Sequence, residues 1–181
     1  ATFYDNVEVE DQWRLGEVDD GWSVMGIALA LERGVMGGTN PAVPLLKHVL
    51  NWAETTPSKN ESLMINNTLM RERIARTAII NQVGQLLTLR AAWIAATGGM
   101  PGVEGSMAKI YASEEYQKVV GWFQQMAGAE GFLSFGAEDS AASGWIDYDA
   151  RHAPVTTIYG GTSEINRNNI AERHLGLPRS R

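Results

Sequence analysis

Apolar and polar residues alternate over residues 2–10, at the start of the chain. Phe3, Val7 and Val9 share one parity, and the residues between them are mostly polar. A period of two is typical of a half-buried β-strand. A lone strand needs partners, and at most a few residues around 13–15 offer one. We therefore interpret residues 1–18 as the end of a preceding β domain.

Beyond residue 18 the apolar positions recur with helical spacing. Residues 22–31 follow an acidic pair and are apolar over more than half of a helical circumference, so we expect this helix to be buried on several sides. Further helices are predicted over residues 40–55, 62–97, 103–127 and 162–175, which are bounded by capping residues, glycine or proline. Residues 135–144 are predicted to form a loop or a short helix. Residues 19–181 thus form one all-α domain, an antiparallel bundle of four or more helices preceded by a short β-strand remnant.

The composition limits the class of protein. The chain has 181 residues, of which 44% are hydrophobic and 20% charged, and its net charge is −6. These values indicate a globular chain and argue against a nucleic-acid partner. Cysteine is absent, and no apolar run approaches the roughly 20 residues of a membrane span. We expect a cytoplasmic protein without a membrane partner. Because it starts with Ala1 and continues at once as strand, we expect it to be part of a longer polypeptide.

The histidines do not indicate a metal site. His48, His152 and His174 lie far apart in the sequence. None has a partner at the spacing of three or four residues that places two ligands on one face of a helix. We therefore predict no metal ligand.

A glycine-rich segment opens the last predicted helix. Gly160 and Gly161 precede Thr162 and Ser163. The free N–H groups and the positive dipole at such a helix start are suited to an anionic or carbonyl oxygen. The alternative is that these glycines serve only as a tight turn between helices.

Glu32 is a second candidate. It lies near the C-terminal end of an apolar helix, where the helix dipole disfavours negative charge and burial raises the pKa of a carboxyl group. A carboxylate in that place is suited to act as a general base. A solvated pair with the neighbouring Arg33 is the alternative that the spacing leaves open.

Residues 158–179, IYGGTSEINRNNIAERHLGLPR, closely resemble the C-terminal signature of the acyl-CoA dehydrogenases. These flavoenzymes remove the α- and β-hydrogens of acyl-CoA thioesters. The segments FYDNVEV and RLGEVDDGW resemble that family's passage from its middle β domain into its C-terminal helical domain, and SMAKIYASE and QMAGAEG resemble two later segments in the expected order. The resemblance implies that the chain carries the C-terminal helical domain alone.

The resemblance also implies a catalytic base. In this family a glutamate removes the α-proton while the β-hydrogen leaves as hydride to FAD. Most members carry this glutamate where the present chain has Gly160, and a minority carry it in an L-E-R context that Leu31, Glu32 and Arg33 match. Glu32 is then the base. Gly160 and Gly161 are assigned to substrate binding, with the Gly160 N–H donating to the thioester carbonyl, and Arg33 to positioning of the CoA moiety.

Similarity to the family further implies flavin contacts and an oligomer. The turn that contacts the dinucleotide is matched by Thr162, Ser163 and Glu164. The loop that reaches the flavin of a neighbouring subunit is matched by Gln125, Gly128 and Ala129. We expect a homo- or hetero-oligomer, a dimer or tetramer, that passes its electrons to a separate acceptor.

Two departures from the family pattern leave two hypotheses. The Arg-x-x-Phe-Gly segment, which gives an arginine to the flavin pyrophosphate, is missing. The stretches ERGVMGG and GGMPGVEGSMAK resemble an actinobacterial-type branch, some of whose members form heterotetramers that act on bulky steroid or polyketide-like side chains. The chain is predicted either to be a catalytic domain with Glu32 as base, or to be a non-catalytic structural subunit or interaction module of a heteromeric assembly.

Overall fold

A computed structural model describes residues 2–36, 40–58, 62–99 and 102–179, with residues 30–36 described by their backbone alone. Six α-helices follow one another along the chain: α1 (Gly21–Met36), α2 (Ala42–Thr55), α3 (Thr68–Ala96), α4 (Glu104–Ala127), α5 (Trp145–Thr156) and α6 (Ser163–Arg173). Among the described residues, the 3₁₀ segment Asp11–Trp13 precedes α1, and the segments Met64–Asn66, Gly128–Phe132 and Ala141–Gly144 lie between helices. The predicted all-α fold is confirmed.

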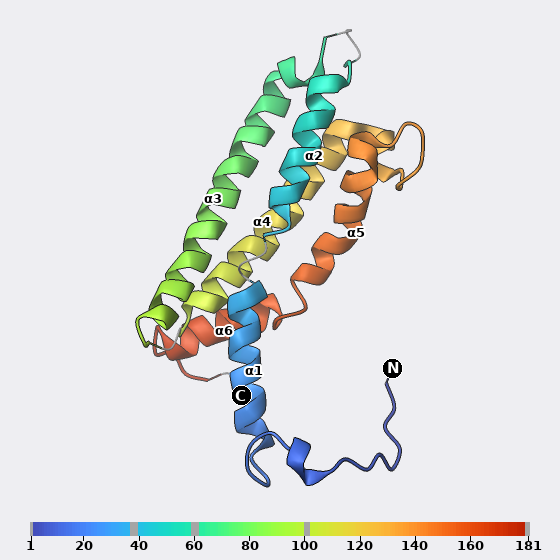
Figure 1. The fold of residues 1–181 in the computed structure, drawn as a ribbon. Coiled ribbons are helices and arrows are strands. Elements are labelled where there is room, and N and C mark those ends of the chain that lie inside the picture. The colour runs from blue at the N-terminus through green and yellow to red at the C-terminus, as the bar shows by residue number, and fades with distance from the viewer. Residues whose placement is uncertain (1, 37–39, 59–61, 100–101, 180–181) are drawn as a thin grey trace.

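Helices α2, α3, α4 and α5 pack on one another as an antiparallel bundle, and α6 crosses its lower end (Figure 1). Helix α4 is central, because it contacts each of the other α-helices in the described chain. The bundle is held by fully or nearly fully buried apolar side chains from four helices. The largest are Leu45 and Val49 of α2, Met70 of α3, Tyr116, Val119 and Phe123 of α4, and Ile146 of α5. None of the described helices has the length and hydropathy of a membrane span.

The predicted strand at the start of the chain does not form. Residues 2–10 are irregular, with a bend at Asn6, where φ is +47°; they pair with nothing among the described residues, and Phe3, Val7 and Val9 are exposed. Residues 11–13 form a 3₁₀ turn instead of a partner strand. Within the described ranges the β-structure consists of one isolated bridge between Pro57 and Leu63. A strand is stable only when its backbone groups are paired.

The expectation that α1 is buried on several sides is wrong for its described side chains. Helix α1 projects from the lower end of the bundle (Figure 1). Trp22 is 85% exposed, and Met25 and Ile27 are also exposed. Helix α1 contacts α3 and α4 of the bundle. The exposed apolar side chains among its described residues therefore lack a partner in the described part of the chain.

Helix α5 was not predicted by the hydrophobic pattern. Its buried residues include Asp147 and Asp149 beside Ile146 and Ala153, so its inward face is not uniformly apolar. Asp147 pairs with Arg151 at 3.0 Å and accepts a hydrogen bond from Ser134. The partners that make these carboxylates compatible with burial come from the folded arrangement.

Asn40, where the sequence predicts the start of the second helix, bonds to the first residue of α2, although the N-cap position is that of Pro41. Its Oδ1 accepts a hydrogen bond from the Ala42 backbone N–H at 3.0 Å, and its Nδ2 donates to Asn81 of α3 at 3.0 Å. Asn81 in turn donates to the carbonyl oxygen of Ala42 at 3.1 Å. The two bonds of Asn81 fasten the start of α2 to the middle of α3, and they satisfy the polar group of the buried Asn81 side chain.

Candidate functional site

The glycine turn predicted to open the last helix lies between α5 and α6, against the first turns of α4. Gly160 and Gly161 have φ angles of +66° and +85°, in the left-handed region that glycine adopts without steric cost. Thr162 caps α6, since its side chain accepts a hydrogen bond from the Ile165 backbone N–H. The Ser163 N–H closes the loop on the carbonyl oxygen of Thr157 at 3.1 Å.

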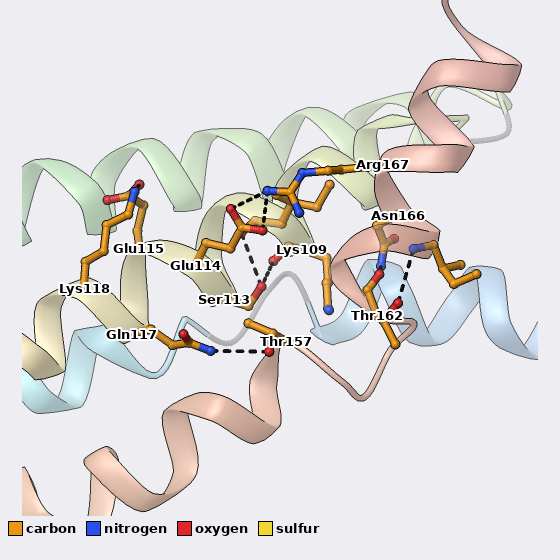
Figure 2. Close-up of polar contacts among 12 residues, drawn as sticks. Lys109, Ser113, Glu114, Glu115, Gln117, Lys118, Thr157, Thr162, Asn166 and Arg167 are labelled. Carbon is orange, nitrogen blue, oxygen red and sulfur yellow. Dashed lines mark hydrogen bonds and ion pairs between the residues drawn. The ribbon is translucent and has the colours of Figure 1, made fainter. Parts of the chain in front are cut away.

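The carbonyl oxygens of this turn all have protein donors. Lys109 Nζ donates to the Gly161 oxygen at 2.6 Å. Asn166 Nδ2 lies 2.8 Å from the Gly161 oxygen, 3.0 Å from the Thr162 oxygen and 3.4 Å from the Gly160 oxygen. Figure 2 shows Lys109 on α4 and Asn166 on α6, on either side of Thr162. The carbonyl edge of the turn is thus directed into the protein.

The N–H edge of the turn has no such partners. Within the described residues, the backbone N–H groups of Gly160, Gly161 and Thr162 meet no protein acceptor. The buried hydroxyl of Ser163 also lacks a partner among the described groups. All four donors lie at the N-terminus of α6, where the helix dipole favours negative charge. The arrangement is suited to hold an anionic or carbonyl oxygen.

A polar groove adjoins this turn. It has a volume of about 350 Å³ and is lined by residues of α4, of α6 and of the segment that joins α5 to α6, namely Glu114, Gln117, Thr157, Ile158, Thr162, Ser163, Glu164 and Arg167. Arg167 pairs with Glu114 at 2.7 Å across the groove (Figure 2). The volume of the groove is near the lower end for small-molecule sites.

The two charged groups nearest the turn have shifted pKa values. Glu164 is fully exposed, and its pKa is lowered because its own backbone N–H and the Thr162 hydroxyl donate to the carboxylate. Lys109 is only 4% exposed. Burial lowers the pKa of its amine, while the negative charges of Glu114 and Glu164 raise it. A lysine is rarely buried without a hydrogen-bonding partner, and here that partner is the turn itself.

The second predicted set of flavin contacts lies elsewhere. Gln125 and Ala129 are exposed at the upper end of α4, and Gly128, with φ of +62°, ends that helix. Gln125 is 16 residues beyond Lys109, which is about 24 Å along the helix axis at 1.5 Å per residue. Figure 1 shows the two ends of α4 at opposite ends of the bundle. Within one chain the fold therefore does not bring the two predicted sets of flavin contacts together.

The predicted base and its neighbour are located by backbone only. Glu32 and Arg33 lie in the last turns of α1, which contacts α3 and α4. Their side chains fall outside the described part of the chain. The proposed role of each therefore stays a prediction from the sequence.

His48 and His152 take part in aromatic contacts. His48 stacks on Trp145 with ring centroids 4.3 Å apart and an interplanar angle of 11°. His152 packs against Tyr148 and Tyr159. Among the described residues, no group of three His, Asp or Glu side chains is placed to hold a metal ion.

Two residues of the site were not identified from the sequence, Lys109 and Asn166. Lys109 is in the segment SMAKIYASE and Asn166 in IYGGTSEINR, so both lie within segments that resemble the family. The one available signal was a lysine in a helix whose neighbouring positions are small or apolar. Nothing in the sequence pairs it with residue 161, which is 52 residues away.

Comparison with known proteins identifies relatives over nearly the whole chain. The family model described as "Acyl-CoA dehydrogenase, C-terminal domain" matches residues 19–175. Acyl-CoA dehydrogenase FadE34 of Mycobacterium tuberculosis is 33% identical over 181 residues, which are 98% of this chain and 22% of FadE34. The chain spans less than half the length of each of the curated relatives it matches.

Solved structures share the fold. The steroid ACAD Tcur3481-Tcur3483 matches with a TM-score of 0.84 and 24% identity, covering 98% of this chain and 45% of that one. Butyryl-CoA dehydrogenase from Megasphaera elsdenii matches with a TM-score of 0.82 and 19% identity, covering 95% of this chain and 43% of that one.

Proposed function

Because the chain belongs to the acyl-CoA dehydrogenase family, whose C-terminal domain it contains, we propose that it forms part of the active site of a flavin-dependent enzyme that removes the α- and β-hydrogens of an acyl-CoA thioester. The observation that carries the proposal is the turn at Gly160–Thr162, which directs its carbonyl oxygens inward and leaves its N–H groups without protein acceptors among the described residues.

In this proposal the turn binds the substrate carbonyl. The Gly160 N–H donates to the thioester oxygen, and Gly161 contacts the same group. Donors that are already oriented stabilise the negative charge that develops on this oxygen when the α-proton leaves, and they need no reorganisation during the reaction. A glycine turn meets this requirement because φ angles of +66° and +85° bring the backbone close to a ligand without an intervening side chain.

Glu32 is the proposed α-proton base. Gly160 has no side chain, so the turn cannot supply a carboxylate itself. The match of Leu31, Glu32 and Arg33 to the L-E-R context of some family members supports Glu32, and Arg33 is proposed to position the CoA moiety. Helix α1, which carries both residues, contacts α4 in the described structure. A carboxylate held near the α-carbon by a helix can remove the proton as a general base.

FAD is the proposed cofactor, and when bound it supplies the acceptor for the β-hydrogen. Thr162, Ser163 and Glu164 are proposed to contact it. The unpartnered Ser163 hydroxyl and the free N–H of Thr162 fit a polar oxygen of the dinucleotide, while the volume of the groove, about 350 Å³, fits only part of it. The remaining contacts must come from residues outside this groove.

An oligomer is part of the same proposal. Gln125 lies about 24 Å along α4 from the level of Lys109, and Gly128 and Ala129 follow at the end of that helix, so we assign all three to the flavin of a neighbouring subunit. The exposed apolar residues of α1 and α3 offer surface for such a neighbour. The solved steroid ACAD carries two protein names, Tcur3481 and Tcur3483, which supports a heteromeric arrangement as one form of this assembly.

A second candidate function is a non-catalytic subunit of such an assembly. The missing Arg-x-x-Phe-Gly segment favours it, because an arginine contact to the flavin pyrophosphate is lost with that segment. In this case Glu32 has no part in catalysis, and the partner chain supplies the base.

Substitution of Glu32 distinguishes the two functions. In the intact protein, with any partner chain present, Glu32→Gln keeps the shape of the side chain but removes its ability to accept a proton. We expect turnover to fall by at least about 10²-fold, the usual contribution of a general base, with flavin still bound. Glu54→Gln, an exposed change on α2, is the matched control and should leave turnover unchanged. Normal turnover by Glu32→Gln would favour the non-catalytic subunit.

A further inference from the structure

Two side chains from different helices meet on the carbonyl edge of the glycine turn. Lys109 reaches it from α4, and Asn166 reaches it from α6. Both are buried, Lys109 being 4% exposed and Asn166 0%. The Gly161 oxygen accepts from both of them, at 2.6 Å and 2.8 Å. No other group of the described chain is placed to do this.

Fixing a carbonyl oxygen also fixes the N–H group of the same peptide unit, which lies on the opposite edge of the turn. A trans peptide unit is planar, and its C=O and N–H point in opposite directions. None of the described peptide bonds is cis. Holding the Gly160 oxygen therefore directs the Gly161 N–H away from Asn166. In the same way, holding the Gly161 oxygen directs the Thr162 N–H away from Lys109 and Asn166.

We propose that Lys109 and Asn166 are positioning residues, which aim the N–H groups of Gly161 and Thr162 at the ligand by holding the carbonyl oxygens of the same peptide units. This inference rests on the proposed function of the turn. It adds that the turn, made of two glycines, is not rigid by itself and depends on α4 for its orientation. The charge of Lys109 strengthens its hydrogen bond relative to one from a neutral donor.

The close packing around Gly161 supports this arrangement. A Cβ atom at Gly161 would lie 3.2 Å from Asn166 Nδ2, so the absence of a side chain there lets the amide reach the backbone. A Cβ atom at Gly160 would meet only the Lys109 Cε, at an ordinary 3.9 Å. The amide thus packs against one glycine and the lysine stem against the other.

Hydrogen exchange in the intact protein tests the hold directly. Lys109→Met keeps the apolar stem of the side chain and removes its donor. We expect exchange of the Ser163 and Asn166 amides, which are bonded to the oxygens of Thr157 and Thr162, to accelerate about tenfold or more, as loss of one charged hydrogen bond predicts. Lys109→Arg keeps a cationic donor and should restore most of the protection. Lys118→Met, at an exposed lysine of the same helix, is the matched control and should leave exchange unchanged.

Steady-state kinetics supply the second readout. Because Gly161 directly follows Gly160, whose N–H is proposed to orient the reacting carbonyl, release of Gly161 in Lys109→Met should displace both residues and lower kcat by about 10²-fold with a smaller change in KM, as expected when a positioned group is misplaced by about 1 Å. Lys109→Arg should recover most of kcat, and Lys118→Met should equal the parent protein.

The outcomes separate this inference from the proposed function. Unchanged exchange at Ser163 and Asn166 in Lys109→Met would overturn the inference, and so would faster exchange spread evenly over all helices, which indicates a general packing role. If Lys109→Met does not fold, Asn166→Ser removes the donor from the other side of the same carbonyls and is judged by the same criteria. Normal turnover in Glu32→Gln would instead contradict the proposed function. That result does not depend on the rate of amide hydrogen exchange at the turn.

Discussion

Tyr116 of α4 donates a hydrogen bond to Oδ1 of Asp149 of α5, and both residues are buried in the bundle. The other carboxylate oxygen, Oδ2, is buried without a partner in the described structure. Burial raises the pKa of Asp149, and the bond from Tyr116 and the nearby His152 only partly oppose this. Burial also raises the pKa of Tyr116, with a further rise from its bond to Asp149. Ionisation of the Asp149 carboxyl group therefore lowers the stability of the folded protein.

This pair predicts a pH-dependent effect of Asp149→Asn. A carboxyl group whose pKa is raised in the folded state stabilises the protein below its ordinary pKa, about 3.9, and this contribution is lost as pH rises through the folded pKa. The asparagine variant keeps an acceptor for Tyr116 and does not titrate. We expect the stability of the variant relative to the parent to increase as the pH rises above the ordinary carboxyl pKa of about 3.9.

Urea unfolding at several pH values measures this difference. Asp139→Asn, an exposed change in the loop before α5, is the control, since it involves no buried pair. A difference in unfolding free energy between Asp149→Asn and the parent that stays constant with pH would contradict the prediction.

Tyr116→Phe should destabilise the protein by about 1–3 kcal/mol, because it leaves Oδ1 of Asp149 without a donor.

The two glycines of the turn are expected to respond unequally to alanine. Both have positive φ angles, which cost an alanine about 1–2 kcal/mol. At Gly160 the added Cβ has room, whereas at Gly161 it comes within 3.2 Å of Asn166 Nδ2. We expect Gly161→Ala to lower the free energy of unfolding more than Gly160→Ala does, as measured by urea unfolding. Equal losses of unfolding free energy in the two variants would contradict this prediction, because they would mean that the Asn166 side chain moves aside without a loss of stability.

The space beside Gly160 also allows a side chain at this position to be tested in catalysis. A carboxylate placed there by Gly160→Glu, in a Glu32→Gln background, would occupy the position that carries the base in most family members. The backbone strain at φ of +66° is the main obstacle, since the nearest atom to the added Cβ is the flexible Lys109 stem at 3.9 Å. We expect a partial return of dehydrogenation over Glu32→Gln alone. No return in a folded, flavin-containing protein would indicate that the proton is removed from another direction.

The outer face of α3 predicts self-association of the 181-residue chain. Ile79, Leu86 and Trp93 are spaced by seven residues, so they share one face of the helix, and all three are exposed. We expect a dimer or tetramer by light scattering, and we expect Leu86→Glu to shift it toward smaller species. Gln85→Glu introduces the same charge at the neighbouring exposed position and should have little effect. A monomeric parent chain would refute this prediction.

The same chain, produced alone, should be colourless. Its polar groove fits only part of a dinucleotide, and the contacts at Gln125, Gly128 and Ala129 lie at the other end of α4. Few contacts do not offset the entropy lost when a large ligand is immobilised. We expect no stoichiometric flavin by absorbance and no dehydrogenase activity. A yellow preparation with one flavin per chain would contradict this prediction, because it would show that the chain alone binds the whole dinucleotide.

The sequence by itself determined the elements whose signals are local. Glycines and capping residues marked the ends of α4 and α6, and Asn40 marked the start of α2. The motif around Gly160 indicated both the fold and the candidate site, because such a turn and helix start are specified by neighbouring residues. The strand over residues 2–10 had an equally clear local signal but did not form, since strand pairing requires backbone groups from elsewhere in a protein.

Only the tertiary structure decided which polar residues are buried and what they contact. Hydrophobic periodicity did not predict α5, because Asp149 is compatible with burial only when Tyr116, 33 residues earlier, donates to it. It did not identify Lys109 either, whose partner Gly161 is 52 residues away. Hydrogen bonds between distant segments leave no period in the sequence, and they determine the orientation of the turn at the site.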